Sequence, residues 1–163
     1  MNKFVLVLLA SFFCISPAIA ELNVTSPSEA CGLLKKLDLT TRGWKNYNGQ
    51  EFGCSSAYKE LGAGFPLANN LAYYVTGSRD TVSEVKLVLN VNNRSMAKDA
   101  HQELLKAAKI LCQKVSGEQL PKPVESAIKN GQANSGKVGN TIFEVIRKDW
   151  PTGKGYEVKV VFK

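Results

Sequence analysis

Residues 71–91, LAYYVTGSRDTVSEVKLVLNV, decide the fold class of this chain. Every second residue from Val85 to Val91 is apolar and mostly polar residues stand between them, which is the two-residue period of a strand with one buried face. Residues 71–76 form a second apolar run, and residues 77–80 between the two runs are of the types that form turns. The stretch therefore predicts an antiparallel hairpin with one face packed against a core.

Two more strands are predicted at the end of the chain, over residues 141–148 and 156–162, where apolar and polar residues again alternate. Residues 149–155 join them and are rich in turn-forming types. A shorter strand is predicted over residues 51–55. The polar, glycine-rich residues 131–139 are predicted to be a mobile connection without regular structure.

Three segments have the period of a helix. The first has Ser26 as its expected N-cap and an apolar stripe over residues 30–37. The longest covers about residues 96–115, with Ser95 as its expected cap, and a shorter helix ends at Gly131. Helices and strands in this order predict an α+β, two-layer sandwich, in which helices pack on one face of an antiparallel sheet of about four to five strands.

The first residues of the chain have the pattern of an export signal. Lys3 precedes an almost wholly apolar run over residues 4–15, and a small-x-small cleavage site ends at Ala20. This run is shorter than the roughly 20 residues that span a bilayer, so a retained anchor or a buried core helix is the weaker interpretation. We expect cleavage of residues 1–20, which leaves residues 21–163 as a single periplasmic or secreted domain without a transmembrane segment.

Three cysteines remain after the expected cleavage, namely Cys31, Cys54 and Cys112, and three pairings are possible. Cys112 falls on the predicted long helix, where it can behave as a buried apolar residue. We therefore predict a disulfide between Cys31 and Cys54, in keeping with an oxidising compartment. Zinc is the competing explanation, but the sequence has no C-x-x-C or H-x-x-x-H pair, so we predict no metal site.

The chain is basic, with a formal net charge of +7 that falls to about +6 when Lys3 leaves with the signal. This charge favours anionic partners, such as phospholipid head groups, lipopolysaccharide, acidic glycans or an acidic protein. The basic residues are scattered along the chain, so a mixed, solvated surface is the simpler interpretation. Nucleic acid is a poor candidate partner outside the cytoplasm.

The residue types that carry catalysis are few. His101 is the only histidine, and Cys112 lies about 16 Å further along the same predicted helix, too far for a Cys–His pair. The string at residues 95–98 matches S-x-x-K, but the other motifs of penicillin-recognising enzymes are missing. The string at residues 153–155 lacks the spacing of a phosphate-binding loop. We therefore predict no catalytic residue and no cofactor, and expect His101 at the edge of the core.

The most suggestive surface combines aromatic and basic residues in or beside the turns. Aromatic side chains and arginine are the types that anchor interfaces. The alternative is that these aromatic residues cap the open end of the sheet; Tyr73 or Tyr74 could belong to the same group. The predicted binding residues are Trp44, Tyr47, Phe52, Arg147, Trp150 and Lys154.

These features favour an exported, non-enzymatic binding module of the bacterial periplasm or envelope, such as an inhibitor, an immunity protein or an accessory chaperone. Its partner is expected to be another envelope protein or an anionic envelope component. The alternative is a small envelope hydrolase that acts on cell-wall or glycan material through carboxylates brought together by the fold. Adhesion to anionic lipid and a structural role in an envelope assembly are two further alternatives.

Overall fold

The computed structural model describes residues 21–65 and 67–163. In chain order its strands are β1 (Lys45–Asn48), β2 (Glu51–Ser55), β3 (Lys59–Leu61), β4 (Asn69–Gly77), β5 (Val82–Val91), β6 (Asn134–Val138), β7 (Thr141–Asp149) and β8 (Tyr156–Phe162). The helices are α1 (Pro27–Gly32), α2 (Ala97–Ser116) and α3 (Lys122–Asn130), with single turns of 3-10 helix at η1 (Lys35–Leu37) and η2 (Arg94–Met96).

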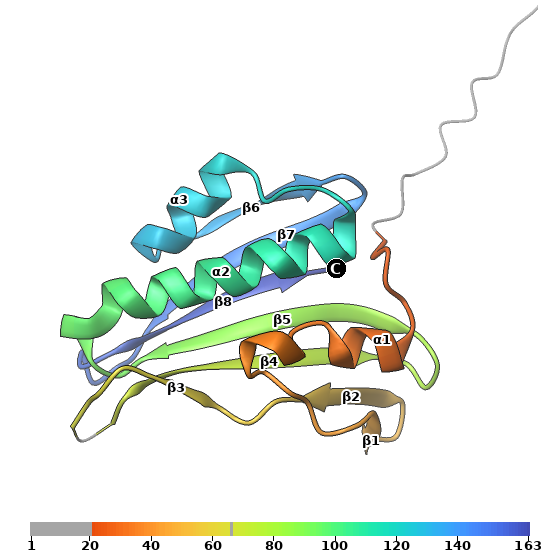
Figure 1. The fold of residues 1–163 in the computed structure, drawn as a ribbon, viewed down its shortest axis with the longest axis horizontal. Helices are drawn as coiled ribbons and strands as arrows, with labels where there is room; N and C mark the ends of the chain where they lie inside the picture. Colours follow the sequence, from red (N-terminus) through yellow and green to blue (C-terminus); the bar gives the residue numbers. More distant parts are fainter. Residues whose placement is uncertain (1–20, 66) are drawn as a thin grey trace, which may run out of the picture.

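The strands form one antiparallel sheet in the order β1-β2-β4-β5-β8-β7-β6, and β3 pairs with β4. The helices cover one face of this sheet, with α2 across its centre, α1 over β4 and β5, and α3 beside β6 and β7 (Figure 1). This two-layer arrangement confirms the predicted α+β fold class. The strand count was too low, since the described residues form eight strands and not four to five.

The core lies between the helices and the inner face of the central strands. On β5, every second side chain from Val85 to Val91 is fully buried, as the alternation predicted. The neighbouring strand β8 contributes alternate side chains from Val158 to Phe162, which are also fully buried. Leu104 of α2 packs in the same cluster. Although β8 is the last strand in the chain, it lies between β5 and β7 in the middle of the sheet.

The strands that the sequence analysis missed are short or lie at the edges. β1 is exposed along its whole length, and β6 is exposed at three of its five residues. An edge strand of this kind buries no regular face, so its sequence has no two-residue period. The prediction of a mobile connection over residues 131–139 was therefore wrong, because Asn134–Val138 pairs with Thr141–Val145 of β7.

Two helix starts differ from the prediction. α1 is only six residues long, and the hydroxyl of its N-cap residue Ser26 does not bind the helix backbone but lies 3.1 Å from the hydroxyl of Ser28. Ser95 does not cap α2. Instead Asn93 begins the preceding 3-10 turn, and its side-chain oxygen accepts hydrogen bonds from the Ser95 amide at 3.1 Å and hydroxyl at 2.7 Å. This is a local bond from a side chain to the backbone two residues ahead, which is typical of asparagine where a helix begins.

The predicted disulfide is present and joins α1 to β2. The Cα atoms of Cys31 and Cys54 are 6.1 Å apart. Cys112 carries a free, fully buried thiol on α2, as predicted, and burial raises the pKa of that thiol. Within residues 21–65 and 67–163, no helix is both long and apolar enough to cross a membrane.

The first described residues, from residue 21 on, pack into the core. Leu22 and Val24 are buried, and the backbone N–H of Asn23 donates to the Val115 carbonyl at 2.7 Å. The N–H of Glu21 donates to the Asn140 carbonyl at 3.2 Å. The segment from residue 21 is therefore part of the folded domain, whereas the predicted export signal, residues 1–20, lies outside the described residues.

Candidate functional site

The residues predicted to bind a partner fall into two separate groups. Trp44, Tyr47 and Phe52 lie at the β1–β2 edge, while Arg147, Trp150 and Lys154 lie at the β7–β8 hairpin. The first group lies at one end of β5, because Phe52 pairs with Gly77 and Gly77 pairs with Val82. The second group lies at the other end, where Val91 pairs with Tyr156. The two ends of β5 are about 30 Å apart at about 3.3 Å per residue, so these residues do not share one surface.

The first group is held by internal contacts. The indole N–H of Trp44 donates to the Arg79 carbonyl at 2.9 Å, and the Arg79 guanidinium lies 5.9 Å from the centre of the Phe52 ring. An open groove of about 530 Å³ runs beside Trp44, but Arg79 and Asp80 balance its charge. Tyr47 remains open to solvent on the edge strand. The lining of this groove therefore carries no net charge.

The second group is also largely committed to the fold. The Arg147 guanidinium lies 3.8 Å from the centre of the Tyr156 ring and donates to both carboxylate oxygens of Asp149, at 3.2 and 2.8 Å. The same guanidinium donates to the Gly131 carbonyl at 3.3 Å, and it holds the pKa of the Asp149 carboxyl below its ordinary value. Lys154 is exposed on the hairpin loop and remains free to reach a partner.

His101 lies in the core, where it joins α2 to α3 and β8. Its Nδ1 lies 2.7 Å from the Ile128 carbonyl, and its Nε2 lies 3.0 Å from the Tyr156 hydroxyl. A neutral ring satisfies both contacts if Nδ1–H donates to the carbonyl and Nε2 accepts from the hydroxyl. Burial lowers the pKa of His101, and the nearby Arg147 charge acts in the same direction.

We expect this histidine to make the domain less stable in mild acid. Because the folded-state pKa lies below the unfolded value of about 6.5, protonation favours the unfolded chain, and stability is lost as the pH falls through that range. Urea unfolding at about pH 7.5 and about pH 5.5 measures the loss, and His101→Gln should show a smaller difference between the two conditions. An equal loss in both proteins would assign the effect to other groups.

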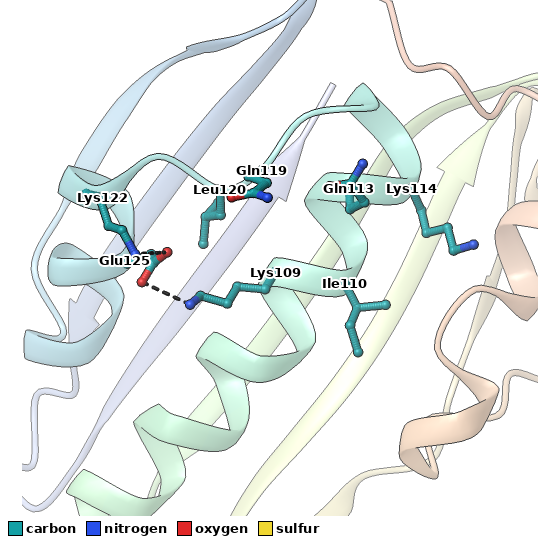
Figure 2. A pocket seen from close by; sticks show the side chains of 8 residues that line it. All are labelled: Lys109, Ile110, Gln113, Lys114, Gln119, Leu120, Lys122 and Glu125. Atoms are coloured by element: carbon teal, nitrogen blue, oxygen red, sulfur yellow. Dashed lines mark hydrogen bonds and ion pairs between the residues drawn. The ribbon is translucent and has the colours of Figure 1, made fainter.

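A groove between α2 and α3 is the candidate site. Its volume is about 460 Å³, and its lining residues come from α2, from the connection and from the start of α3 (Figure 2). Those residues are Lys109, Ile110, Gln113, Lys114, Gln119, Leu120, Lys122 and Glu125. Three lysines and one carboxylate therefore line the groove together with apolar side chains; Lys109 and Lys122 reach Glu125, whereas Lys114 points away from it (Figure 2). The groove carries a surplus of positive charge.

The one carboxylate in this groove is held by two of the lysines. The Lys109 ammonium lies 3.0 Å from one oxygen of Glu125, and the Lys122 ammonium lies 3.3 Å from the other (Figure 2). These contacts, first of all that with Lys109, keep the pKa of the Glu125 carboxyl below its ordinary value. Lys114 is exposed and makes no ion pair with any residue that the structure describes. Its charge is therefore available to a ligand.

The local sequence explains why the groove forms. Gly117 adopts a positive φ of 75° and ends α2, which allows the chain to turn back. Pro121 occupies the N-cap position of α3, so the second helix starts soon after the turn. Both helices were predicted from the sequence, but no residue pattern indicated that α3 folds back beside the lysines of α2. The one sequence signal for the groove is that lysines on the outer face of a helix are followed closely by a second helix.

Comparison with known proteins adds one finding. A family model described as a family of unknown function, DUF6030, matches residues 21–145. The chain belongs to this family. The DUF6030 match begins at the residue where the described domain begins, and it ends within β7, before β8. No curated protein and no solved structure matches the chain. Within the described residues, no group of three histidine, cysteine or acidic side chains is arranged to hold a metal ion.

Proposed function

We propose that this DUF6030 protein is an exported, non-enzymatic binding module of the bacterial periplasm or envelope, and that it holds an anionic partner in the groove between α2 and α3. The observation that carries the proposal is the surplus of lysine ammonium groups around the groove, with only the Glu125 carboxylate among them. Positive potential in a concave site attracts anionic groups and raises their rate of association. An inhibitor, an immunity protein or an accessory chaperone would use such a site.

Three observations support the exported location. The domain packs from Leu22 onward, directly after the expected cleavage at Ala20. The family match also begins at residue 21, which supports a boundary there. A disulfide such as that between Cys31 and Cys54 persists in oxidising compartments and is rare in the cytosol. Nucleic acid is not expected as a partner in that location.

The hydrolase alternative receives no support from the acidic groups. A glycosidase uses a carboxyl group whose pKa is raised so that it can donate a proton. The carboxyl groups of Glu125 and Asp149 have pKa values lowered by their lysine and arginine partners, which is the opposite direction. His101 is enclosed by its own hydrogen bonds and by the core. The groove therefore supports binding better than hydrolysis.

A retention experiment tests the proposed function. Residues 21–163, biotinylated at the C-terminus, are incubated with envelope extract, and the retained partner is quantified. The double variant Lys114→Gln/Lys122→Gln removes two groove charges but leaves the Lys109–Glu125 pair in place. It should retain about fivefold less partner, since exposed charge contacts contribute up to about 1 kcal/mol each.

The matched control is Lys35→Gln/Lys137→Gln, which removes the same charge from exposed positions on η1 and β6. It should retain as much partner as the wild type. Absence of any retained partner would count against a binding function. An equal fall in both double variants would show that net charge, and not the groove, retains the partner.

A further inference from the structure

The cationic surface continues beyond the groove along α2. A second hollow of about 360 Å³ is lined by Gln102, Leu105, Lys106, Lys109 and Ile110. It shares Lys109 and Ile110 with the first groove, so the two hollows adjoin along α2. From Gln102 to Gln113 the helix axis advances by about 16 Å at about 1.5 Å per residue. The combined surface is therefore elongated along α2.

This elongated surface offers three kinds of contact. Lys106 and Lys114 are exposed ammonium groups without an ion pair among the described residues, and they lie on either side of Lys109 along α2. Ile110, which is 37% exposed, provides an apolar contact between them. The glutamine side chains at both ends can bind a peptide backbone, although the Gln113 amide already donates to the Gly117 carbonyl at 2.9 Å. Gln102, Lys106, Ile110 and Lys114 follow one another at four-residue intervals and therefore lie along one ridge of α2, whereas Lys109 points toward Glu125 (Figure 2).

Resting on the proposed function, we infer that the occupant is an extended acidic peptide segment of a partner protein, with carboxylates on either side of one apolar side chain. Carboxylates of such a segment would meet the lysines, and its apolar side chain would cover Ile110. An anionic lipid surface is flat, whereas these lysines line two hollows beside and between the helices. The shape therefore favours a peptide over a membrane.

Glu125 occupies the place of one ligand carboxylate. It holds Lys109 and Lys122 at 3.0 and 3.3 Å, which is how a peptide carboxylate would bind them. The bound segment and Glu125 therefore compete for the same two ammonium groups. Replacing this carboxylate by a neutral amide of the same shape should strengthen the binding of an acidic peptide, whereas loss of a lysine that lines the two hollows should weaken it.

The test uses a fluorescent peptide of about eight extended residues, which is longer than the surface, with glutamate around one central leucine. Anisotropy titration with residues 21–163 at about 50 mM salt measures its Kd. We expect Glu125→Gln to lower the Kd about threefold, and Lys106→Gln and Ile110→Ser each to raise it about threefold. Lys137→Gln should leave it unchanged. The same peptide with glutamine in place of glutamate should bind at least about tenfold more weakly.

Two outcomes overturn the inference. If vesicles containing phosphatidylglycerol bind the domain and the acidic peptide does not, the occupant is a lipid surface. If the peptide binds but Glu125→Gln weakens it or has no effect, the peptide does not use the ammonium groups held by this carboxylate. In either case a partner retained from envelope extract would leave the proposed binding function standing, whereas loss of both the peptide and that partner would remove both proposals.

Discussion

A chain that ends at residue 155, and therefore lacks β8, is expected not to fold cooperatively. β8 pairs with β5 on one side and with β7 on the other, so its removal opens both ladders at once. The fully buried side chains of Val158, Val160 and Phe162 are lost from the core at the same time. The hairpin of β6 and β7 would then have no strand connecting it to the rest of the sheet. Marginal stability of about 5–15 kcal/mol cannot absorb such a loss.

Circular dichroism and thermal unfolding of residues 21–155 and 21–163 measure this effect. A milder change to the same strand is Phe162→Ala in residues 21–163. This variant should fold, but its free energy of unfolding should fall by about 4 kcal/mol because of the cavity that it leaves. A cooperative transition of the shortened chain near the temperature of the full domain would contradict the central role of β8. The family match ends at residue 145, so its bounds alone would suggest a shorter folded unit than the structure supports.

Removal of the disulfide by Cys31→Ala/Cys54→Ala should destabilise the domain by about 3 kcal/mol. The bond closes a loop between residues 23 positions apart, and it fastens the short helix α1 to β2 near the edge of the sheet. Without it, the unfolded chain gains conformational freedom. A fall of about 10 °C in Tm is expected for a domain of this size.

Reductant separates the cross-link from the packing of the two side chains. In reductant the wild-type domain should lose most of the roughly 3 kcal/mol that the disulfide contributes to its free energy of unfolding. The stability of Cys31→Ala/Cys54→Ala should not change in reductant. Cys112→Ala is the control, since its thiol is free and buried, and this variant should respond to reductant as the wild type does. A wild-type Tm that does not respond to reductant would show that the bond does not support the fold.

The sequence was sufficient for the fold class but not for the full sheet. The strands over Val82–Val91 and Tyr156–Phe162 bury one face, and that burial requires alternating residue types that can be read directly. β1, β3 and β6 are short or exposed, so no burial constrains their sequences. The disulfide pairing was predictable because the helical period of α2 indicated that Cys112 is a buried apolar residue, which left Cys31 and Cys54 to pair.

The candidate site could not be predicted because it depends on tertiary arrangement. The aromatic and basic residues of the loops were expected to act together, but the strand pairing places the two groups at opposite ends of β5. The groove depends on Lys109 and Glu125, which are distant in sequence and meet only because α3 folds back beside α2. Neither helix has a local pattern that reveals its neighbour. Charge along a single helix indicates a solvated face equally well.

The position of the last strand also has a consequence for how the protein is made. The slot between β5 and β7 stays empty until residues 156–162 have been synthesised and released. During that interval two long strand edges have unpaired backbone groups, and such edges invite association with other chains. A chain that emerges from its N-terminus would therefore complete this sheet only after residues 156–162 have emerged.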